Sequence, residues 1–126
     1  MEQRFFKCEH CGNLIAVVKD AKVPMSCCGE KMKELIPGTT DAAVEKHVPE
    51  FEVKEGCVCV KVGEVEHPMV EAHFIEWVFL QTDKGTQMKK LTPGEKPEVC
   101  FAILPEEKVE AVYAYCNLHG LWKKEA

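Results

Sequence analysis

The sequence predicts a mainly β protein in which a small, metal-bound N-terminal segment precedes an antiparallel β-sandwich. Short apolar runs separated by turn residues fill the chain from about residue 50 onward. The first 36 residues, by contrast, contain only two short apolar runs, 13–18 and 32–36, but hold four of the eight cysteines. A segment of this size cannot fold on apolar burial alone, so we expect it to require a bound metal.

Four segments of the second part have the composition of strands: 57–62, 71–81, 99–104 and 109–116. In the first of them, Val58, Val60 and Val62 alternate with Cys57 and Cys59, as expected for a strand with one buried face. Turn residues at 83–85 and 92–94 separate the runs, and no segment has a convincing helical pattern. Several short strands at this spacing predict an antiparallel sandwich.

A boundary between two domains is expected at Pro37-Gly38, because this pair marks a turn and the cysteine-rich pattern ends there. We therefore expect domains at 1–37 and 38–126. Residues 1–40 carry six basic and five acidic groups, and residues 41–126 carry ten and sixteen. Neither part has the basic stripe of a nucleic-acid-binding protein.

A cytoplasmic protein with reduced thiols is expected. The sequence begins without the basic start and apolar run of a signal peptide, and no stretch of about 18 apolar residues is present. Neither secretion nor membrane spanning is therefore predicted. In a reducing compartment, eight cysteines favour metal ligation over disulfides.

A first metal site is predicted from a C-x-x-C pair and a later pair of adjacent cysteines. Its four candidate ligands are Cys8, Cys11, Cys27 and Cys28. Four thiolates enclose one tetrahedral metal, and a structural zinc site remains open at this point. Adjacent cysteines reach one metal only through a strained turn, which Gly29 would ease. His10, inside the first pair, is expected to be an exposed loop residue and not a ligand.

A second metal site is predicted in the second part of the chain, which contains four of the five histidines. The candidate ligands are His47, His67, His73, His119 and Cys116. Imidazoles with one thiolate suit iron, copper or zinc. A blue-copper site needs a weak axial methionine after the histidine, and no methionine follows Met88. A copper electron carrier is therefore disfavoured.

Taken together, the motifs resemble desulfoferrodoxin, the two-iron class of superoxide reductase, over essentially the full chain. The resemblance rests on the four cysteines, on Glu45 to Pro49 (EKHVP), on His67 to Trp77 (HPMVEAHFIEW) and on Cys116 to Trp122 (CNLHGLW). It implies a rubredoxin- or desulforedoxin-like iron domain and an immunoglobulin-like, neelaredoxin-like catalytic domain. It also implies a homodimer with rubredoxin as the electron donor.

The resemblance implies two iron ions, the first bound by the four cysteines and the second by the histidines and Cys116. The histidines would lie equatorially and the Cys116 thiolate axially, with the opposite position open for one-electron reduction of superoxide to hydrogen peroxide. Backbone N–H groups of Leu118 and His119 are expected to hydrogen-bond the Cys116 sulfur. A thiolate in that position donates electron density to the metal.

Two residues next to His47 are expected to take part in catalysis. The Lys46 ammonium can attract an anion locally although the domain is acidic. Glu45 resembles the glutamate that occupies the sixth position of the ferric iron after product leaves. Two other functions remain open: a rubredoxin-like electron carrier and, behind it, a zinc-stabilised binding module.

The three remaining cysteines have no motif partner. Cys57, Cys59 and Cys100 lie in predicted strands and are expected to be buried small hydrophobes. Cys57 and Cys59 would face the same side of one strand, but a pair at i and i+2 does not suit a disulfide. Trp122 is expected to pack around the second metal.

Overall fold

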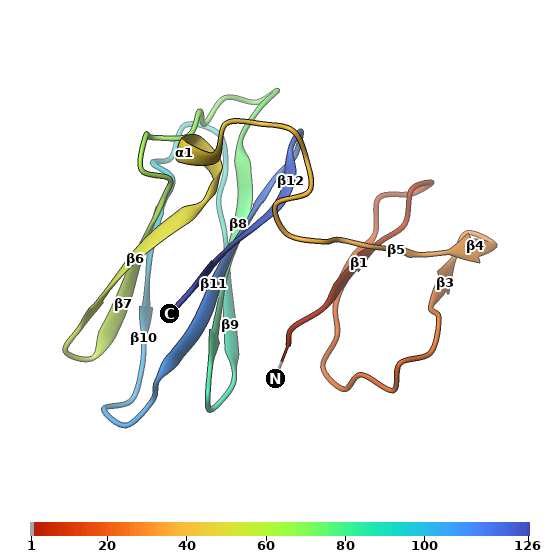
Figure 1. The fold of residues 1–126 in the computed structure, drawn as a ribbon. Coiled ribbons are helices and arrows are strands. Elements are labelled where there is room, and N and C mark those ends of the chain that lie inside the picture. The colour runs from red at the N-terminus through yellow and green to blue at the C-terminus, as the bar shows by residue number, and fades with distance from the viewer. Residues whose placement is uncertain (1) are drawn as a thin grey trace. The chain divides into compact units, whose positions relative to one another are not determined.

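The computed structural model describes residues 2–126 and is almost entirely β (Figure 1). The chain forms two compact units, Met1–Ile36 and Pro37–Ala126. Every strand pair recorded in the described residues is antiparallel. The prediction of a mainly β protein with an N-terminal four-cysteine site is confirmed. Within residues 2–126, no helix is long and apolar enough to cross a membrane.

The first unit is built from five short strands: β1 (Phe5–Lys7), β2 (Leu14–Ala16), β3 (Ser26–Cys27), β4 (Glu30–Lys31) and β5 (Lys33–Glu34). Strands β2, β1 and β5 form one sheet in that order, and β3 and β4 form a separate hairpin. Strand β2 lies within the apolar run 13–18, and β5 lies within the run 32–36. None of these strands exceeds three residues, so the ladder hydrogen bonds of this unit are few.

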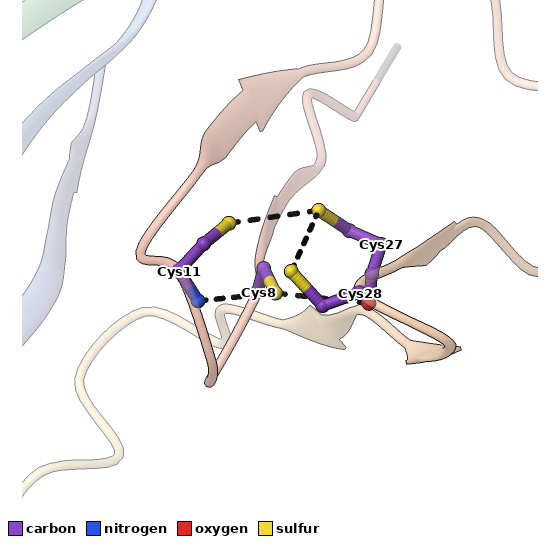
Figure 2. A group of neighbouring side chains, drawn as sticks. All are labelled: Cys8, Cys11, Cys27 and Cys28. Carbon is purple, nitrogen blue, oxygen red and sulfur yellow. Dashed lines mark hydrogen bonds between the residues drawn. The ribbon is translucent and has the colours of Figure 1, made fainter.

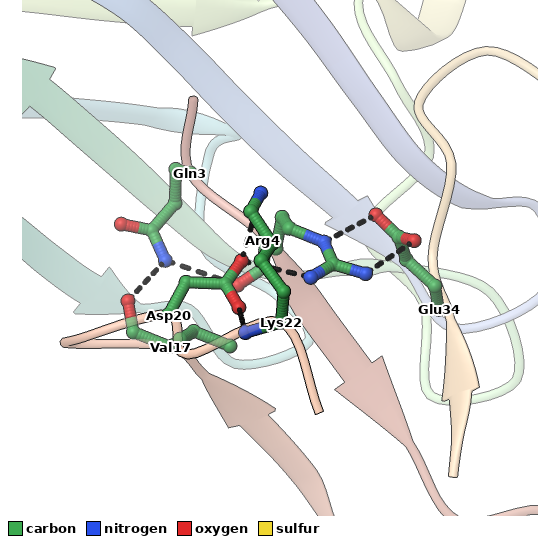
Figure 3. A network of polar contacts seen from close by, with 6 residues as sticks. All are labelled: Gln3, Arg4, Val17, Asp20, Lys22 and Glu34. Carbon is green, nitrogen blue, oxygen red and sulfur yellow. Dashed lines mark hydrogen bonds and ion pairs between the residues drawn. The ribbon is translucent and has the colours of Figure 1, made fainter. Parts of the chain in front are cut away.

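An ion-pair network around Arg4 ties the start of the first unit to its later segments (Figure 3). The Arg4 guanidinium binds both carboxylate oxygens of Glu34 in β5, at 3.1 and 3.0 Å, and contacts Asp20 at 2.8 Å. The Gln3 side-chain amide donates to the backbone carbonyl of Val17 at 3.0 Å. These contacts supply cross-links in a unit that has little apolar core.

The second unit contains one short helix and seven strands: α1 (Val44–His47), β6 (Pro49–Lys54), β7 (Cys57–Val62), β8 (Ile75–Thr82), β9 (Thr86–Lys90), β10 (Glu98–Ala102), β11 (Val109–Cys116) and β12 (Gly120–Glu125). The strand order is β10-β7-β6 in one sheet and β12-β11-β8-β9 in the other (Figure 1). One buried cluster draws side chains from both sheets, including Val60, Phe101, Leu80 and Val112. The predicted antiparallel sandwich is therefore confirmed, with the three-plus-four arrangement of an immunoglobulin-like fold.

Three strands and the helix were not predicted. In β6, Phe51 and Val53 alternate with charged residues, which is a strand signal that the sequence reasoning missed. Strand β9 is a polar, largely exposed edge strand. Strand β12 is apolar only at Leu121 and Trp122 and ends in charged residues. Helix α1 has four residues, too few for a helical period to be visible in the sequence.

The expectation that Cys57, Cys59 and Cys100 are buried small hydrophobes is wrong. Because Val58 and Val60 of β7 fill the core, Cys57 and Cys59 lie on the opposite face of that strand and are only half-buried. Cys100 is exposed and lies directly opposite Cys59 in the β7–β10 register. These two residues form a disulfide, so the expectation of reduced thiols is also wrong for this pair.

Candidate metal centres

The first candidate centre lies between two turns of the first unit (Figure 2). Cys8 and Cys11 belong to the turn after β1, which is closed by hydrogen bonds from the Gly12 N–H to the Cys8 carbonyl and from the Cys8 N–H to the Asn13 carbonyl. Backbone N–H groups also point at the sulfurs: that of Cys11 lies 3.5 Å from the Cys8 Sγ, and that of Asn13 lies 3.4 Å from the Cys11 Sγ. Such N–H groups stabilise thiolates.

Of the adjacent cysteines, Cys27 ends β3 and Cys28 begins the two-residue turn that joins β3 to β4. Cys28 and Gly29 have φ values of 54° and 76°. A two-residue hairpin turn with positive φ at both central residues suits glycine but strains another residue at the first position. The predicted strained turn is therefore confirmed, and the strain is at Cys28. This turn brings the sulfurs of Cys27 and Cys28 to within 3.9 Å of each other.

The geometry and electrostatics of the four sulfurs fit a single metal ion. A tetrahedron with metal–sulfur distances of about 2.3 Å has edges of roughly 3.8 Å, and the Cys11 and Cys27 sulfurs lie 3.6 Å apart. Contacts with the sulfurs of Cys11 and Cys8 raise the pKa of Cys28 to about 12, whereas the Cys11 N–H holds the pKa of Cys8 near 6. Four thiolates this close together need a cation to remain ionised.

His10 is exposed, as predicted for a loop histidine. Its Nε2 lies 2.9 Å from a carboxylate oxygen of Glu30 and does not join the four sulfurs. The sulfurs of Cys8, Cys11, Cys27 and Cys28 all lie within 4.8 Å of one another.

The second candidate centre lies at one end of the sandwich and gathers side chains from four separate elements. His47 ends helix α1, His67 and His73 lie in the β7–β8 connection, Cys116 ends β11, and His119 lies in the turn before β12. Donor atoms of His47, His67, His73 and Cys116 lie within 4.8 Å of one another. The Nδ1 of His119 adds a fifth donor, 3.1 Å from the Nε2 of His47. The structure thus brings together all five residues predicted for this site.

The four imidazoles form a square. Adjacent ring centroids are 4.6 Å apart for His47 and His67, 4.7 Å for His67 and His73, 5.0 Å for His73 and His119 and 4.9 Å for His119 and His47. Each adjacent pair is close to perpendicular, at 79° to 87°. The diagonal between His47 and His73 is 6.2 Å, with the rings at 28°.

Hydrogen bonds to the backbone orient two of the four imidazoles. The Nδ1 of His47 lies 2.7 Å from the Ala43 carbonyl, and that of His67 lies 2.6 Å from the Pro68 carbonyl. A carbonyl accepts a hydrogen, so Nδ1 carries the proton in both rings and Nε2 presents a lone pair. Those two Nε2 atoms are 3.1 Å apart and cannot hydrogen-bond each other. Two ligands at right angles, each about 2.1 Å from a metal, would be separated by roughly 3 Å.

Two further observations agree with a cation between the rings. The Nε2 of His73 is buried and has no hydrogen-bond partner within the described residues. Burial lowers the pKa of His67 to about 4, with smaller effects of the neighbouring imidazoles in the same direction, and burial also lowers the pKa values of His47 and His73. Burial therefore favours the neutral form of these three rings, which is the form that binds a metal. This donor set fits a transition metal.

Cys116 is fully buried beside the imidazole square, with its Sγ 4.0 Å from the His119 Nδ1. Burial raises the pKa of its thiol, while hydrogen bonds from the backbone N–H groups of His119 and Leu118 act in the opposite direction. These two N–H groups are the ones predicted to act on the sulfur.

Three residues support the second centre from outside the set of ligands. Trp122 was predicted there from the sequence, but Asn117 and Gly63 were missed. The Asn117 side chain accepts from the Phe74 N–H at 3.0 Å and donates to the Ala72 carbonyl at 3.1 Å, so it holds both neighbours of His73. The Trp122 indole donates a hydrogen bond to the His119 carbonyl at 2.9 Å, and its ring packs on His47. Trp122 therefore lies beside the second centre, as predicted. Asn117 and Trp122 lie within the CNLHGLW segment, which was the available signal.

Gly63 is the third supporting residue, and nothing in the sequence marked it. A Cβ at this position would lie 2.8 Å from the Glu45 carbonyl oxygen and 2.8 Å from the Lys46 carbonyl carbon. The Val65 N–H donates to the same Glu45 carbonyl at 2.8 Å. The absence of a side chain at Gly63 therefore lets the segment that bears Glu45 and Lys46 lie against the β7–β8 connection.

Glu45 and Lys46 are both exposed on α1, immediately before buried His47. The Lys46 charge acts on the imidazoles, since it contributes to the lowered pKa values of His47 and His73. This places the ammonium within electrostatic reach of the second centre. The Glu45 side chain has no recorded hydrogen bond or ion pair within the described residues.

Comparisons with known proteins identify the family of the chain. The profile of the desulfoferrodoxin family matches residues 39–125, and that of the desulfoferrodoxin N-terminal domain matches residues 1–35. The chain is 45% identical to desulfoferrodoxin of Syntrophotalea carbinolica over 120 residues, which cover 95% of this chain and 94% of that protein. It is 45% identical to desulfoferrodoxin of Nitratidesulfovibrio vulgaris over 99% of this chain and 98% of that protein. The crystal structure of the superoxide reductase from Treponema pallidum superposes with a TM-score of 0.84 at 41% identity, covering 99% of this chain and 100% of that one. The chain therefore belongs to the desulfoferrodoxin family.

Proposed function

We propose that this protein is a superoxide reductase, an oxidoreductase that reduces superoxide by one electron to hydrogen peroxide at an iron held by the second centre. The observation that carries the proposal is the square of four imidazoles with the buried Cys116 thiol beside it. Family membership and the similarity to the Treponema pallidum superoxide reductase support the same function.

The proposed ligands of this iron are His47, His67, His73, His119 and Cys116. Bound iron would supply the electron by passing from the ferrous to the ferric state. The protein's own contribution is to orient His47 and His67 through the Ala43 and Pro68 carbonyls, while burial favours the neutral form of both rings. One thiolate against a divalent cation leaves a net positive site, which favours the approach of an anion.

Lys46 and Glu45 are proposed to act at the open side of this site. The unit carries more acidic than basic groups, and its overall field therefore repels superoxide. The Lys46 ammonium, which already affects two of the imidazoles, would offset that field locally. Exposed Glu45, one residue closer to the N-terminus, is proposed to occupy the open position once product has left.

The first centre is proposed to bind a second iron through Cys8, Cys11, Cys27 and Cys28 and to define a desulforedoxin-like domain over 1–37, with the catalytic domain at 38–126. An electron-carrier role for this centre is supported by the exposure of Cys11 and Cys28, because an exposed metal site can accept electrons from a partner protein. Rubredoxin as that partner, a cytoplasmic location and a homodimer are expectations drawn from the family resemblance.

Metal analysis and stopped-flow mixing of reduced protein with superoxide test the proposal. We expect two iron atoms per chain and rapid oxidation of the histidine-bound iron alone. Cys116→Ser should abolish the thiolate-to-iron absorption band together with the activity. Retention of the band in this variant, or an iron that superoxide does not oxidise, would show that the proposed function is wrong.

The role of Lys46 is tested separately with a matched lysine. Lys46→Ile should slow the second-order reaction by about tenfold at low salt, because a single local charge steers the anion. Lys54 is the control. It is the last residue of β6, about 17 Å along the strand from Pro49, the first residue of β6, which lies two positions after His47. Lys54→Ile should leave the rate within about twofold. Equal rates for the two variants would remove the steering role.

A further inference from the structure

Three cysteines outside both metal centres cluster on the outer face of the β10-β7-β6 sheet. Cys57 and Cys59 share one face of β7, and Cys100 lies opposite Cys59 in β10. Cys59 and Cys100 form a disulfide, and the Sγ of Cys57 lies 3.9 Å from that of Cys59. A free thiol therefore contacts one sulfur of a disulfide.

The disulfide is accessible from solvent. Cys100 is exposed, Cys59 is half-buried, and both line a groove of about 500 Å³ on this face of the sheet. The core beneath is filled by Val58 and Val60, which lie on the opposite face of β7. Exposed disulfides are the readily reduced ones, whereas structural disulfides resist the thiol pool.

We propose that Cys59–Cys100 is a redox-active disulfide that exchanges with dithiols, and that Cys57 assists the exchange by donating a hydrogen bond to the Cys59 sulfur. Its co-reactant is a dithiol in the reducing direction and a disulfide in the oxidising direction. This site is separate from both metal centres and does not depend on the proposed reduction of superoxide.

The exchange proceeds in two displacements. A thiolate of the reductant attacks the Sγ of Cys100, the more exposed of the two residues. The bond to Cys59 breaks, and Cys59 leaves as a thiolate with the electron pair. The Cys57 S–H, 3.9 Å away, stabilises that thiolate until it takes up a proton. The second thiolate of the reductant then attacks its own partner sulfur in the mixed disulfide and releases Cys100. Two electrons and two protons have then passed from the dithiol to the pair.

The groove does not select a reductant by charge. Three carboxylates and Lys61 line it: Glu50, Glu52 and Glu98. Lys124 pairs with Glu50 at 3.9 Å, and the Lys89 ammonium binds the Cys100 carbonyl at 2.5 Å. Cations therefore match the carboxylates, and a neutral dithiol can approach the disulfide.

Reduction of the metal-loaded protein tests the proposal, since bound metal protects the other five cysteines from alkylation. We would incubate it with millimolar dithiothreitol, quench with a maleimide mass tag and count tagged cysteines by intact mass. The number should rise from one to three while metal content and circular dichroism stay unchanged.

Two variants test the part played by Cys57. Cys57→Ala should slow reduction about fivefold, the effect of one lost hydrogen bond, and Cys57→Ser, which keeps a donor, should stay within about twofold of the parent. A disulfide that resists dithiothreitol until the metals are lost would overturn the proposal. Equal rates for the parent, Cys57→Ala and Cys57→Ser would overturn the role of Cys57.

Discussion

The two candidate metal centres differ in what holds their ligands in place. In the first unit, four sulfurs lie on two turns between strands of two or three residues, and Cys11 and Cys28 are exposed. In the second unit, the ligands lie at the end of a sandwich with a continuous buried core, and His47 and His67 are each fixed by a backbone carbonyl. We infer that the first unit needs its bound metal in order to fold, whereas the second unit folds without metal and its fold positions the metal ligands.

Removal of the metals is expected to have the largest effect, and it should affect the stability of the two units differently. In small cysteine-ligated domains, binding of a structural metal contributes roughly 10–16 kcal/mol. Because the site does not exist in the unfolded chain, this binding free energy stabilises the folded state. Removing metal from the whole protein should therefore unfold residues 2–36 and leave residues 37–126 folded. Amide hydrogen exchange would show loss of protection in β1 to β5 and retained protection in β7, β8 and β11. Loss of protection in both units together would contradict the inference.

Acid should act on the metal-free second unit through its histidines. Burial holds the pKa of His67 near 4, below its usual 6.5, so between these values the unfolded chain binds more protons than the folded one. Stability is then present above pH 6.5 and is lost as the pH falls toward 4. We expect the free energy of unfolding to drop by roughly 2–3 kcal/mol between pH 7 and 4.5 from this residue alone.

Urea unfolding of the metal-free protein across this pH range measures the effect. His67→Gln is the control variant, because it removes the titrating group and should flatten the pH dependence in this range. An equally steep dependence in the variant would assign the effect to other groups.

Substitution of an asparagine beside each centre is expected to have a smaller effect, on the affinity for metal. Asn117→Ala should weaken metal binding at the second centre by 10- to 100-fold, as loss of an outer ligand support typically does, because Asn117 holds both neighbours of His73. Asn13, whose amide lies 3.7 Å from the Cys27 Sγ, is the matched residue in the first unit. Asn13→Ala should change affinity by only a few-fold.

Competition with a chelator, followed separately by the absorption bands of the two centres, would measure both affinities. Asn117→Asp keeps the acceptor toward Phe74 but loses the donor toward Ala72, and it should fall between Asn117→Ala and the parent. A larger loss for Asn13→Ala than for Asn117→Ala would reverse the proposed order of dependence on the fold.

Much of the fold and of the candidate sites could be predicted because the signals are local. Spacing alone placed Cys8 with Cys11, and strand alternation identified β7 and β11. Strand β6 shows the same alternation, with Phe51 and Val53 between charged residues, but it was not predicted. The edge strand β9 could not be predicted in this way, because its residues are almost all polar and its place is decided by pairing with β8. The role of Gly63 likewise depends on the close approach of a segment about 17 residues away.

By itself, the sequence determined the mainly β class, the two groups of metal-ligating residue types and the resemblance to one family, because residue type and spacing are written along the chain. Only the tertiary structure decided how the four imidazoles form a square and which supports surround them. It also decided the pairing of Cys59 with Cys100. The physical reason is register: alternation assigns a residue to a face of its strand, but only the pairing of β7 with β10 determines which residue lies opposite it.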